Sequence, residues 1–407
     1  MLIVKIFYNI ILFVLIPFLM PIGYLMALKK KEDGDFFERL GFVTFPEPPS
    51  KSIWFHCASV GEVRSLKLIT DMIKSDFPDL NIIVSTTTAT GKQEAQRLIT
   101  PYHAFLLPIE NSLAVAHIIH YMNVRALIII DTELWFNLIN SAAKHTKLFM
   151  LNARMSDRSS KSYVRFRFVF APLLSKFQTI YTKSADDTER FAAVTGNKKN
   201  IETLGNIKFQ TRKPKPEPKE YAYLNGHKIF SAASTHKGEE EIIIEAFKKS
   251  GYGGKLVIAP RHMNRVGDVV LLAEKAGLTV SRLTEQNHDT QVIVSDKFGT
   301  LDELYAMSDR IFVGGSLDNT GGHNIYEAVM FEKQVCVGSN MANFREIFIT
   351  ASKYNAAVTV SSADDIARYI TAPLTEADFN GFFSEMDAQQ EGIMTKIKEA
   401  VADVSAG

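Results

Sequence analysis

Cysteine is scarce in this sequence, with only two among 407 residues, Cys57 and Cys336. Two cysteines cannot build a disulfide framework or a cysteine-based zinc cluster, and a reduced, cytosolic setting fits them. An excess of charge is also absent, because 46 Lys and Arg residues stand against 45 Asp and Glu residues. A net charge of +1 gives no general reason to expect a nucleic-acid partner, so any basic patch must be local.

Three common signatures of catalytic or nucleotide-binding sites are missing as well. The segment 89–93 reads ATGKQ and lacks both the leading glycine and the final Ser or Thr of a P-loop. The pair Gly314 and Ser316 lacks the closing glycine of a nucleophile elbow, because Asp318 stands there. No G-x-G-x-x-G follows a predicted strand, which argues against a dinucleotide-dependent enzyme.

Charge is lacking altogether between residues 6 and 28, a stretch about as long as a helix that crosses a bilayer. Three lysines at 29–31 follow it, and by the positive-inside tendency the bulk of the protein then lies in the cytoplasm. A cleaved signal peptide fits less well, since no small-x-small cleavage site precedes the lysines. Pro17, Pro21 and Gly23 also allow a kinked segment that enters one leaflet, so a full span and a shallow anchor both remain open.

The sequence does contain a regular alternation of apolar runs and helix-like stretches, which is typical of α/β proteins with parallel sheets. The segment 213–219 reads KPKPEPK and is predicted to be an extended linker, because its prolines fit neither a helix interior nor a sheet. The predicted strands are 53–57, 82–85, 104–107, 126–131, 148–151 and 179–182 before this linker and 229–231, 256–259, 292–295, 311–313, 335–337 and 357–360 after it.

This alternation predicts an α/β fold of two doubly wound, Rossmann-like lobes, with ligands at the carboxyl ends of the strands and in the cleft. The chain is long enough for two domains that each bury a core. The predicted division is an anchor at 1–31, a first lobe at 32–212, a linker at 213–220, and a second lobe with the C-terminal helices at 221–407.

The most informative stretch is 310–338, RIFVGGSLDNTGGHNIYEAVMFEKQVCVG. It predicts a strand, a glycine turn, a helix from His323 to Glu332 and a second strand, the βαβ unit whose helix N-terminus binds phosphate. Glycines let a backbone approach a phosphate closely, and Glu327 could then reach a ribose diol. The alternative is that Asn324 and Glu327 form a capping pair such as any helix uses.

Two acidic segments follow predicted strands in the first lobe. Glu62 lies where a strand becomes a helix and could act as a general base toward a hydroxyl, or could form a capping box with Ser59. Asp131 and Glu133 end a very apolar strand and could bind a divalent metal. We favour one functional glutamate beside a solvated or capping aspartate, since no second cluster of metal ligands occurs.

Basic residues follow strands in the second lobe. Arg261, in the segment Ala259-Pro260-Arg261-His262, could hold a phosphate by a bidentate contact or lie on the surface without a ligand. The segment 231–239 has the same strand-to-helix position and could bind phosphate or only cap its helix.

Six segments together resemble the 3-deoxy-D-manno-octulosonate (Kdo) transferases, in order and over almost the whole chain. They are HCASVGEV, DTELW, NARMSDRS, ASTHKGEE, APRH and FVGGSLDNTGGHNIYE. The resemblance implies a glycosyltransferase of the GT-B fold, anchored in the inner membrane with its catalytic lobes in the cytoplasm. It further implies inverting transfer of Kdo from CMP-Kdo to the lipid A precursor (lipid IVA) in lipopolysaccharide biosynthesis, without a metal or other cofactor.

Carried over by position, the resemblance makes Glu62 the general base and places Glu133 and Lys208 where the transition state is stabilised. Thr320 is a departure, since several relatives carry arginine there. Alternatives are a different nucleotide-sugar donor or a non-catalytic nucleotide-sugar-binding protein. The residues that match CMP-contacting positions are Pro260, Arg261, Leu301, Asp302, Glu303, Asn324, Ile325, Tyr326 and Glu327.

Overall fold

The computed structural model describes residues 2–30, 33–208, 212–287, 289–373 and 375–406. Lys31, the last of the three lysines behind the apolar segment, lies outside these residues. The chain divides into two compact units. The first comprises Met1–Phe209 together with Gln389–Gly407, and the second comprises Gln210–Ala388.

This division corrects the predicted one at the C-terminus, where the whole tail was assigned to the second lobe. The long helix α16 (Phe379–Ala406) begins in the second unit and ends in the first. Its apolar side chains enter the core under the first sheet, because they recur at helical spacing on one face. These side chains are Ile393, Ile397, Val401 and Val404.

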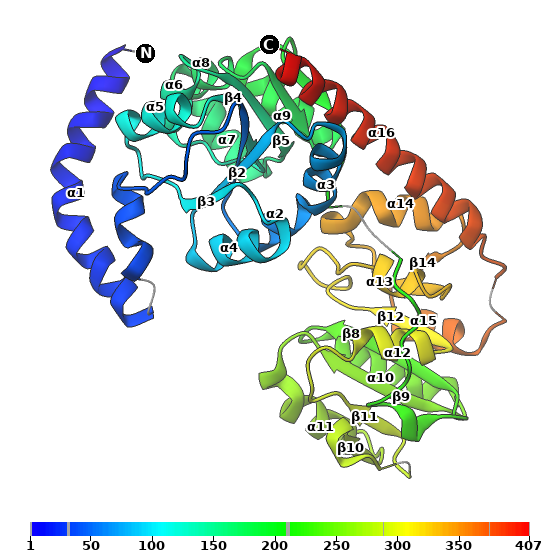
Figure 1. Ribbon diagram of the computed structural model, residues 1–407. Helices are drawn as coiled ribbons and strands as arrows, with labels where there is room; N and C mark the ends of the chain where they lie inside the picture. The colour runs from blue at the N-terminus through cyan, green and yellow to red at the C-terminus, as the bar shows by residue number, and fades with distance from the viewer. Residues whose placement is uncertain (1, 31–32, 209–211, 288, 374, 407) are drawn as a thin grey trace. The chain divides into compact units, whose positions relative to one another are not determined.

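The first unit is built on a seven-stranded parallel sheet in the order β3-β2-β1-β4-β5-β6-β7, coloured blue to green in Figure 1. Core clusters cover both of its faces, so its central strands read as continuous apolar runs. Chain order reverses between β1 and β4, which pair directly. The strands are β1 (Ser52–Cys57), β2 (Asn81–Thr86), β3 (His103–Leu106), β4 (Val124–Ile130), β5 (Lys147–Ala153), β6 (Thr179–Thr182) and β7 (Ile201–Thr203).

Helices pack on both faces of this sheet, as a parallel sheet requires. The helical segments of the first unit are α1 (Leu2–Lys30), η1 (Asp33–Leu40), α2 (Val60–Ser65), α3 (Lys67–Asp76), α4 (Ala89–Glu94), η2 (Ala95–Ile99), α5 (Ser112–Tyr121), α6 (Phe136–Ala142), α7 (Asp157–Arg165), α8 (Arg167–Leu174) and α9 (Ala185–Thr195).

The second unit repeats the plan with a parallel sheet in the order β10-β11-β9-β8-β12-β13-β14, and its order reverses between β8 and β12. Its strands are β8 (Ile229–Thr235), β9 (Lys255–Pro260), β10 (Val280–Arg282), β11 (Val292–Val294), β12 (Arg310–Val313), β13 (Val335–Val337) and β14 (Ala357–Thr359). Its helical segments are η3 (Ala222–Leu224), α10 (Glu239–Ser250), η4 (Met263–Arg265), α11 (Val266–Lys275), η5 (Leu283–Glu285), α12 (Leu301–Met307), α13 (Tyr326–Val329), η6 (Ala342–Phe344), α14 (Arg345–Lys353) and α15 (Ala363–Thr371).

The α/β prediction with two doubly wound lobes is confirmed, and every predicted strand is present to within a few residues. Two short edge strands, β7 and β10, were not predicted. The described part of the linker, 213–219, forms neither helix nor strand. The helix predicted from His323 to Glu332 is much shorter, since α13 has only four residues.

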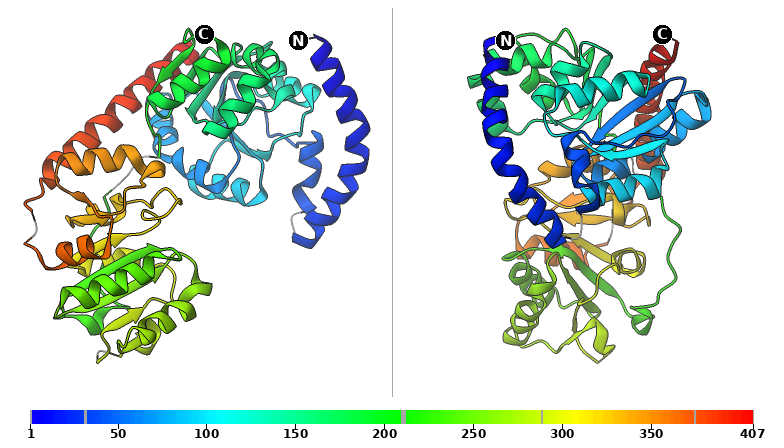
Figure 2. Two further views of the ribbon diagram at one scale, coloured as in Figure 1. Left: turned by 180° about the vertical axis from the view of Figure 1, so that it is seen from behind. Right: turned by 60° about the vertical axis from the view of Figure 1, so that its left-hand side comes forward.

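Helix α1 is long and apolar enough to cross a membrane over Val4–Lys29, with a mean hydropathy of 2.4, and Pro17 and Pro21 lie within it. Both views of Figure 2 show it running beside the first unit. Its less exposed positions recur about every four residues and therefore form one face, while most side chains between them are exposed. These positions are Val4, Lys5, Tyr8, Asn9, Leu12, Ile16, Met20, Gly23, Tyr24 and Ala27.

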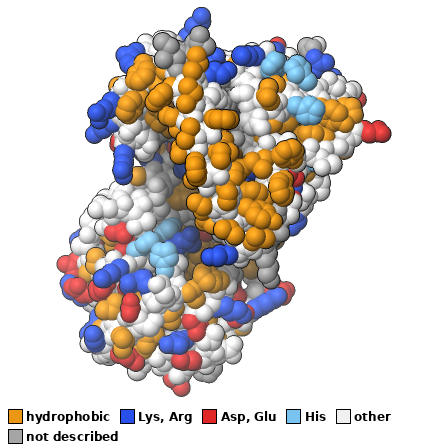
Figure 3. Space-filling view, turned by 90° about the vertical axis from the view of Figure 1, so that its left-hand side faces the viewer, with side chains coloured by type: hydrophobic (Ala, Val, Ile, Leu, Met, Phe, Trp, Pro, Cys, Tyr) orange, Lys and Arg blue, Asp and Glu red, His pale blue; other side chains and the backbone are white. Residues whose placement is uncertain are grey.

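Contacts at both ends of α1 hold this face against the unit. Near its start the rings of Tyr8 and Phe136 lie 4.9 Å apart, and near its end those of Tyr24 and Phe36 lie 5.3 Å apart. Between the ends, α1, η1 and the start of α5 line an apolar cavity of about 710 Å³. The exposed face of α1 contributes to the broad hydrophobic surface in Figure 3.

Candidate active site

The reversal of strand order in the first sheet places acidic residues together. Glu62 follows β1, and the loop that contains Asp131 and Glu133 follows β4, the paired neighbour of β1. Ligands of doubly wound sheets bind outside the carboxyl ends of the strands at such a switch point. The topology thus brings together residues that are far apart in the sequence.

Glu62 forms the capping interactions that its spacing allows. Its carboxylate accepts hydrogen bonds from the Ala58 amide at 2.6 Å and the Ser59 hydroxyl at 2.9 Å, and Ser59 Oγ accepts from the Glu62 amide. Only 8% of Glu62 is exposed. An ionised carboxylate has about four acceptor positions, so the two donors leave capacity for a further one. Capping and general-base roles are therefore compatible.

Burial and neighbouring charges set the ionisation of this cluster. The pKa of Glu62 is raised, chiefly by burial and further by Asp131, while the Ala58 and Ser59 hydrogen bonds and the charge of Lys208 oppose the rise. Burial also raises the pKa of Glu133, and the charge of Glu62 adds to that rise. The structure thus brings Glu62 within electrostatic reach of both Glu133 and Lys208, three residues singled out from the sequence.

Asp131 corrects a prediction, since it is neither solvated nor a helix cap. It is 5% exposed and has a left-handed backbone with φ +57°. Its carboxylate accepts a hydrogen bond from Asn152 Nδ2 and lies 3.4 Å from Arg154 Nε. Asn152 in turn accepts the Ile207 amide at 3.4 Å, next to Lys208. Asp131 therefore links the loops that carry Glu133, Arg154 and Lys208.

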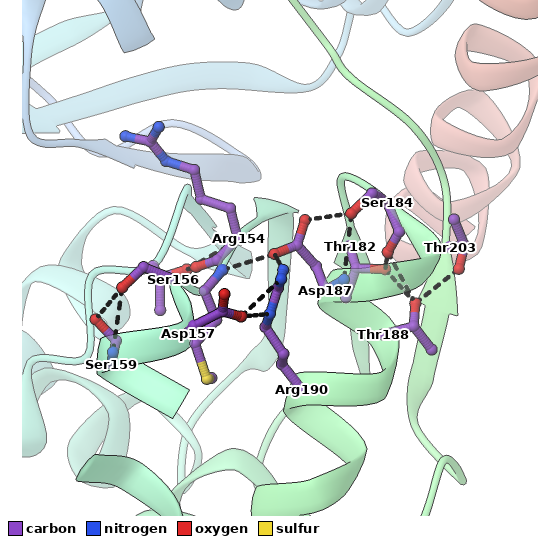
Figure 4. A network of polar contacts seen from close by, with 12 residues as sticks. Arg154, Ser156, Asp157, Ser159, Thr182, Ser184, Asp187, Thr188, Arg190 and Thr203 are labelled. Atoms are coloured by element: carbon purple, nitrogen blue, oxygen red, sulfur yellow. Dashed lines mark hydrogen bonds and ion pairs between the residues drawn. The ribbon is translucent and has the colours of Figure 1, made fainter. Parts of the chain in front are cut away.

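Figure 4 shows how the loop after β5 is held. The buried Asp187 carboxylate accepts hydrogen bonds from the Met155 amide at 2.8 Å and the Ser184 hydroxyl at 2.6 Å. Arg190 binds Asp157 at 2.8 Å. The backbone on either side of Arg154 is thereby fixed, and its exposed side chain points away from this network. The segment NARMSDRS contains these residues, but no pattern in it assigns a role to Asn152 or Arg154.

In the second unit, the turn after β12 differs from the expected phosphate cradle. Glu239, 1% exposed, accepts hydrogen bonds from the amides of Gly315 at 2.8 Å and of Ser316 and Leu317 at 3.0 Å. The Gly322 amide donates to the Gly315 carbonyl at 2.6 Å. A protein carboxylate thus occupies the place predicted for a ligand phosphate at the first glycine pair, and Glu239 closes the turn.

At the carboxyl ends of the second sheet, Arg261 lies within electrostatic reach of both His323 and Glu327. Arg261 directly follows β9, and its side chain is exposed. Burial, together with the charges of His236 and Arg261, lowers the pKa of His323 to about 4. Burial raises the pKa of Glu327, while the hydrogen bond from Asn324 and the charge of Arg261 act to lower it.

His236 and His323 form a close pair beside these residues. Their Nε2 atoms lie 2.9 Å apart and their rings are nearly parallel. The Thr320 hydroxyl donates to Asp318 at 2.7 Å. The Asn324 amide donates to Glu327 at 3.3 Å, so the predicted pairing of these two residues is present as a side-chain contact.

The remaining donor-site residues have structural contacts. The Glu303 carboxylate accepts hydrogen bonds from the amides of Lys219, Glu220 and Tyr221 at the end of the linker. Asp302 forms an ion pair with Lys213 at 2.7 Å. The other four are largely enclosed, being partly buried or buried: Pro260, Leu301, Ile325 and Tyr326.

Metal ligands are not clustered in the described part of the chain. Within it, no group of three or more His, Cys, Asp or Glu side chains is arranged to hold an ion. The side chains of Asp131 and Glu133 instead bind protein groups, and Trp135 Nε1 donates to Glu133 at 3.0 Å.

Solved structures define the class of this protein. Anabaena HepE in complex with UDP matches with a TM-score of 0.58 at 13% identity, over 87% of this chain and 99% of that one. The lipopolysaccharide outer core galactosyltransferase WaaB matches with a TM-score of 0.56 at 10% identity, over 86% and 98%. At these identities the likeness shows the fold, which is the GT-B arrangement of two Rossmann-like lobes.

Sequence relatives define the family. The family model described as 3-deoxy-D-manno-octulosonic-acid transferase (kdotransferase) matches residues 34–211. The chain is 30% identical to the 3-deoxy-D-manno-octulosonic acid transferase of Haemophilus influenzae, over 92% of this chain and 91% of the relative. A bifunctional glycosyltransferase/methyltransferase of Fusobacterium nucleatum is 32% identical over 86% of this chain, which spans only 59% of that protein. The chain belongs to the family of Kdo transferases.

The buried carboxylates predict a stability effect whose sign depends on pH. A glutamate whose pKa is raised in the folded state destabilises the fold above that pKa, and the penalty disappears as pH falls below the unfolded value of about 4.3. Glu133→Gln should therefore raise the Tm at pH 8, and the gain should shrink toward pH 4. Differential scanning fluorimetry across this range measures the effect.

Glu94 provides a control, because its pKa is shifted in the direction opposite to that of Glu133. Hydrogen bonds from Arg97 and Arg64, two largely exposed arginines, lower the pKa of the Glu94 carboxyl to about 2. Glu94→Gln should leave the Tm unchanged or slightly lower at pH 8, because exposed ion pairs stabilise weakly. A Glu133→Gln variant that is less stable than wild type at pH 8 contradicts the role assigned to burial.

Proposed function

We propose that this protein transfers Kdo from CMP-Kdo to the lipid A precursor, lipid IVA, with inversion at the anomeric carbon. Family membership supports the reaction class. The observation that carries the mechanism is the position of Glu62, which lies at the switch point of the first sheet with a pKa raised by burial. A base with such a pKa is a more effective proton acceptor near neutral pH than an ordinary glutamate.

The chemistry assigned to the first unit is proton removal. The Glu62 carboxylate takes the proton of the acceptor hydroxyl as that oxygen bonds to the anomeric carbon of Kdo and the bond to the CMP phosphate breaks. Positive charge develops on the sugar, and Glu133, whose carboxylate is oriented by Trp135, can stabilise it. Lys208 acts electrostatically on Glu62 and favours its ionised form.

The chemistry assigned to the second unit is donor binding. Arg261 has an exposed guanidinium suited to a phosphate, and the half-buried Glu327 can accept hydrogen bonds from the two hydroxyls of a ribose. Protein cations and hydrogen-bond donors then take up the charge of the leaving monophosphate. We propose that no divalent metal takes part.

The membrane attachment follows from α1. A helix that spanned the bilayer could not keep a folded unit against its whole length, because the hydrocarbon core excludes a water-soluble surface. The contacts at Tyr8 and Tyr24, at opposite ends of α1, therefore favour an anchor that enters one leaflet. We place it in the cytoplasmic leaflet of the inner membrane, with both units in the cytoplasm.

Replacement of the proposed base should abolish most of the transfer. Glu62→Gln keeps the size of the side chain and can still pair with Ala58 or Ser59, so the fold and CMP affinity should survive. The rate should fall by about 10²–10⁴. The assay is Kdo transfer from CMP-Kdo to lipid IVA by the purified protein in detergent, with CMP affinity measured on the same samples. Transfer within a few-fold of wild type would make Glu62 a cap alone and move the search for the base to Glu133.

Donor binding can be tested apart from turnover. Arg261→Ala and Glu327→Ala should each weaken CMP binding by about 1–3 kcal/mol, the value of a hydrogen bond to a charged group. Calorimetric titration with CMP measures it, and Arg282→Ala, an exposed arginine elsewhere in the unit, should bind as wild type does.

Unchanged affinity in both variants would return Glu327 to its contact with Asn324 as its only role. The same preparation tests the metal. Transfer should persist in the presence of EDTA, whereas a loss of transfer that Mg²⁺ restores would make Asp131 and Glu133 candidate ligands.

The one-leaflet anchor predicts the accessibility of both termini. A cysteine tag placed before Met1 and another placed after Gly407 should both be protected from a membrane-impermeant maleimide in intact cells. Permeabilised cells, in which both tags react, provide the control. An N-terminal tag that reacts from outside would establish a full span, and an exposed C-terminal tag would reverse the orientation.

A further inference from the structure

Asn9 carries the single amide side chain in the uncharged stretch of α1 between residues 6 and 28. Asn9 donates from Nδ2 to the Lys5 carbonyl at 2.8 Å, and its Oδ1 accepts from Asn137 Nδ2 at 2.9 Å. An amide placed in an apolar environment destabilises the protein unless it is hydrogen-bonded. A helix that served only as a tether would gain from an apolar residue at this position.

The partner of Asn9 belongs to a buried network. Asn137 is fully buried, and its Nδ2 also donates to the Glu110 carbonyl at 2.9 Å. The Glu110 carboxylate accepts the amides of Phe136 at 2.9 Å and Asn137 at 2.6 Å, and Tyr8 of α1 also hydrogen-bonds to it. Glu110 thus satisfies two amides at the start of α6 that have no partner within the helix.

Helix α6 begins directly after the loop that carries Glu133. Trp135 occupies its N-cap position and holds the Glu133 carboxylate through Nε1 at 3.0 Å. The ring of Tyr8 packs on Phe136, the next residue. A continuous series of contacts therefore runs from Asn9 and Tyr8 in the membrane helix, through the start of α6, to Glu133.

We infer that α1 is a positioning element for the transfer reaction as well as an anchor: Asn9 fixes the start of α6 and through it the orientation of Glu133. Asn9 is a positioning residue, since it touches no reacting atom. The inference rests on the proposed role of Glu133 and on a helix that lies beside the unit. Displacement of a catalytic group by about 1 Å can lower a rate by about 10²-fold, so a loosened loop has a measurable effect.

The test compares three single variants of the full-length protein in detergent and in lipid vesicles. Asn9→Leu removes the amide at similar size, and Asn9→Gln keeps it. Phe13→Ala, at an 81% exposed position on the same helix, is the control. Asn9→Leu should lower kcat by about 10- to 100-fold with unchanged KM for CMP-Kdo, CMP affinity and vesicle flotation. Asn9→Gln should recover most of the loss, and Phe13→Ala should transfer at the wild-type rate.

Tryptophan fluorescence can report the conformation of the loop that carries Glu133 without any enzymatic turnover. The two tryptophans are Trp54, which is fully buried, and Trp135, which is partly exposed beside Glu133. In a Trp54→Phe background, Asn9→Leu should shift the Trp135 emission to longer wavelength, as water reaches the indole, and Phe13→Ala should not. This arm stays informative if the wild type transfers no Kdo, an outcome that would overturn the proposed function alone.

Two outcomes overturn the inference. Asn9→Leu with wild-type kcat and unchanged Trp135 emission shows that Asn9 does not position the loop. Loss of CMP affinity or flotation in parallel with kcat shows that Asn9 supports folding or anchoring only.

Discussion

The candidate active site depends most on the buried carboxylate of Asp131. It accepts a hydrogen bond from the Asn152 amide and lies against Arg154, and its charge adds to the burial that raises the pKa values of Glu62 and Glu133. Asn152 Oδ1 in turn accepts a hydrogen bond from the Ile207 amide, beside Lys208. Removal of this carboxylate would release three loops at once. The geometry assigned to the base and to the groups that stabilise charge therefore rests on one side chain that touches no substrate in our account.

Burial of carboxylates at the carboxyl ends of strands in both sheets destabilises a fold, and this protein offsets the effect with specific hydrogen-bond donors. The Glu62 carboxylate accepts hydrogen bonds from a backbone amide and a hydroxyl, and the Glu110 carboxylate accepts them from two backbone amides. The Glu239 carboxylate accepts them from backbone amides of the turn after β12. Each donor set fixes a loop as well as satisfying a charge. The same chemistry thus serves stability where the carboxylate is fully engaged, as at Glu239, and leaves acceptor capacity for the proposed base where it is not, as at Glu62.

Much of the fold could be predicted from the sequence, because strands buried on both faces are continuous apolar runs. The edge strands β7 and β10 were missed since each has only three residues, and they include polar ones. Glu62 and Glu133 could be singled out because each follows such a run. Contacts between distant residues could not be foreseen: Glu239 reaches the Gly315 amide across 76 positions, and Asn9 reaches Asn137 across 128. The packing of α16 in the core of the first unit is another contact between distant residues, and it could not be foreseen for the same reason.

The most direct measurement of the central claim, that a buried glutamate at the first switch point removes the acceptor proton, is the pH dependence of kcat/KM for Kdo transfer to lipid IVA. The account predicts an acid limb with a midpoint above about 4.3, the ordinary pKa of glutamate, because burial raises the pKa values of Glu62 and Glu133 and both act in their ionised forms. Lys208→Met should move this limb to higher pH, since the lysine charge favours the ionised carboxylate. An acid limb at or below the ordinary glutamate pKa, unmoved by Lys208→Met, would contradict the account.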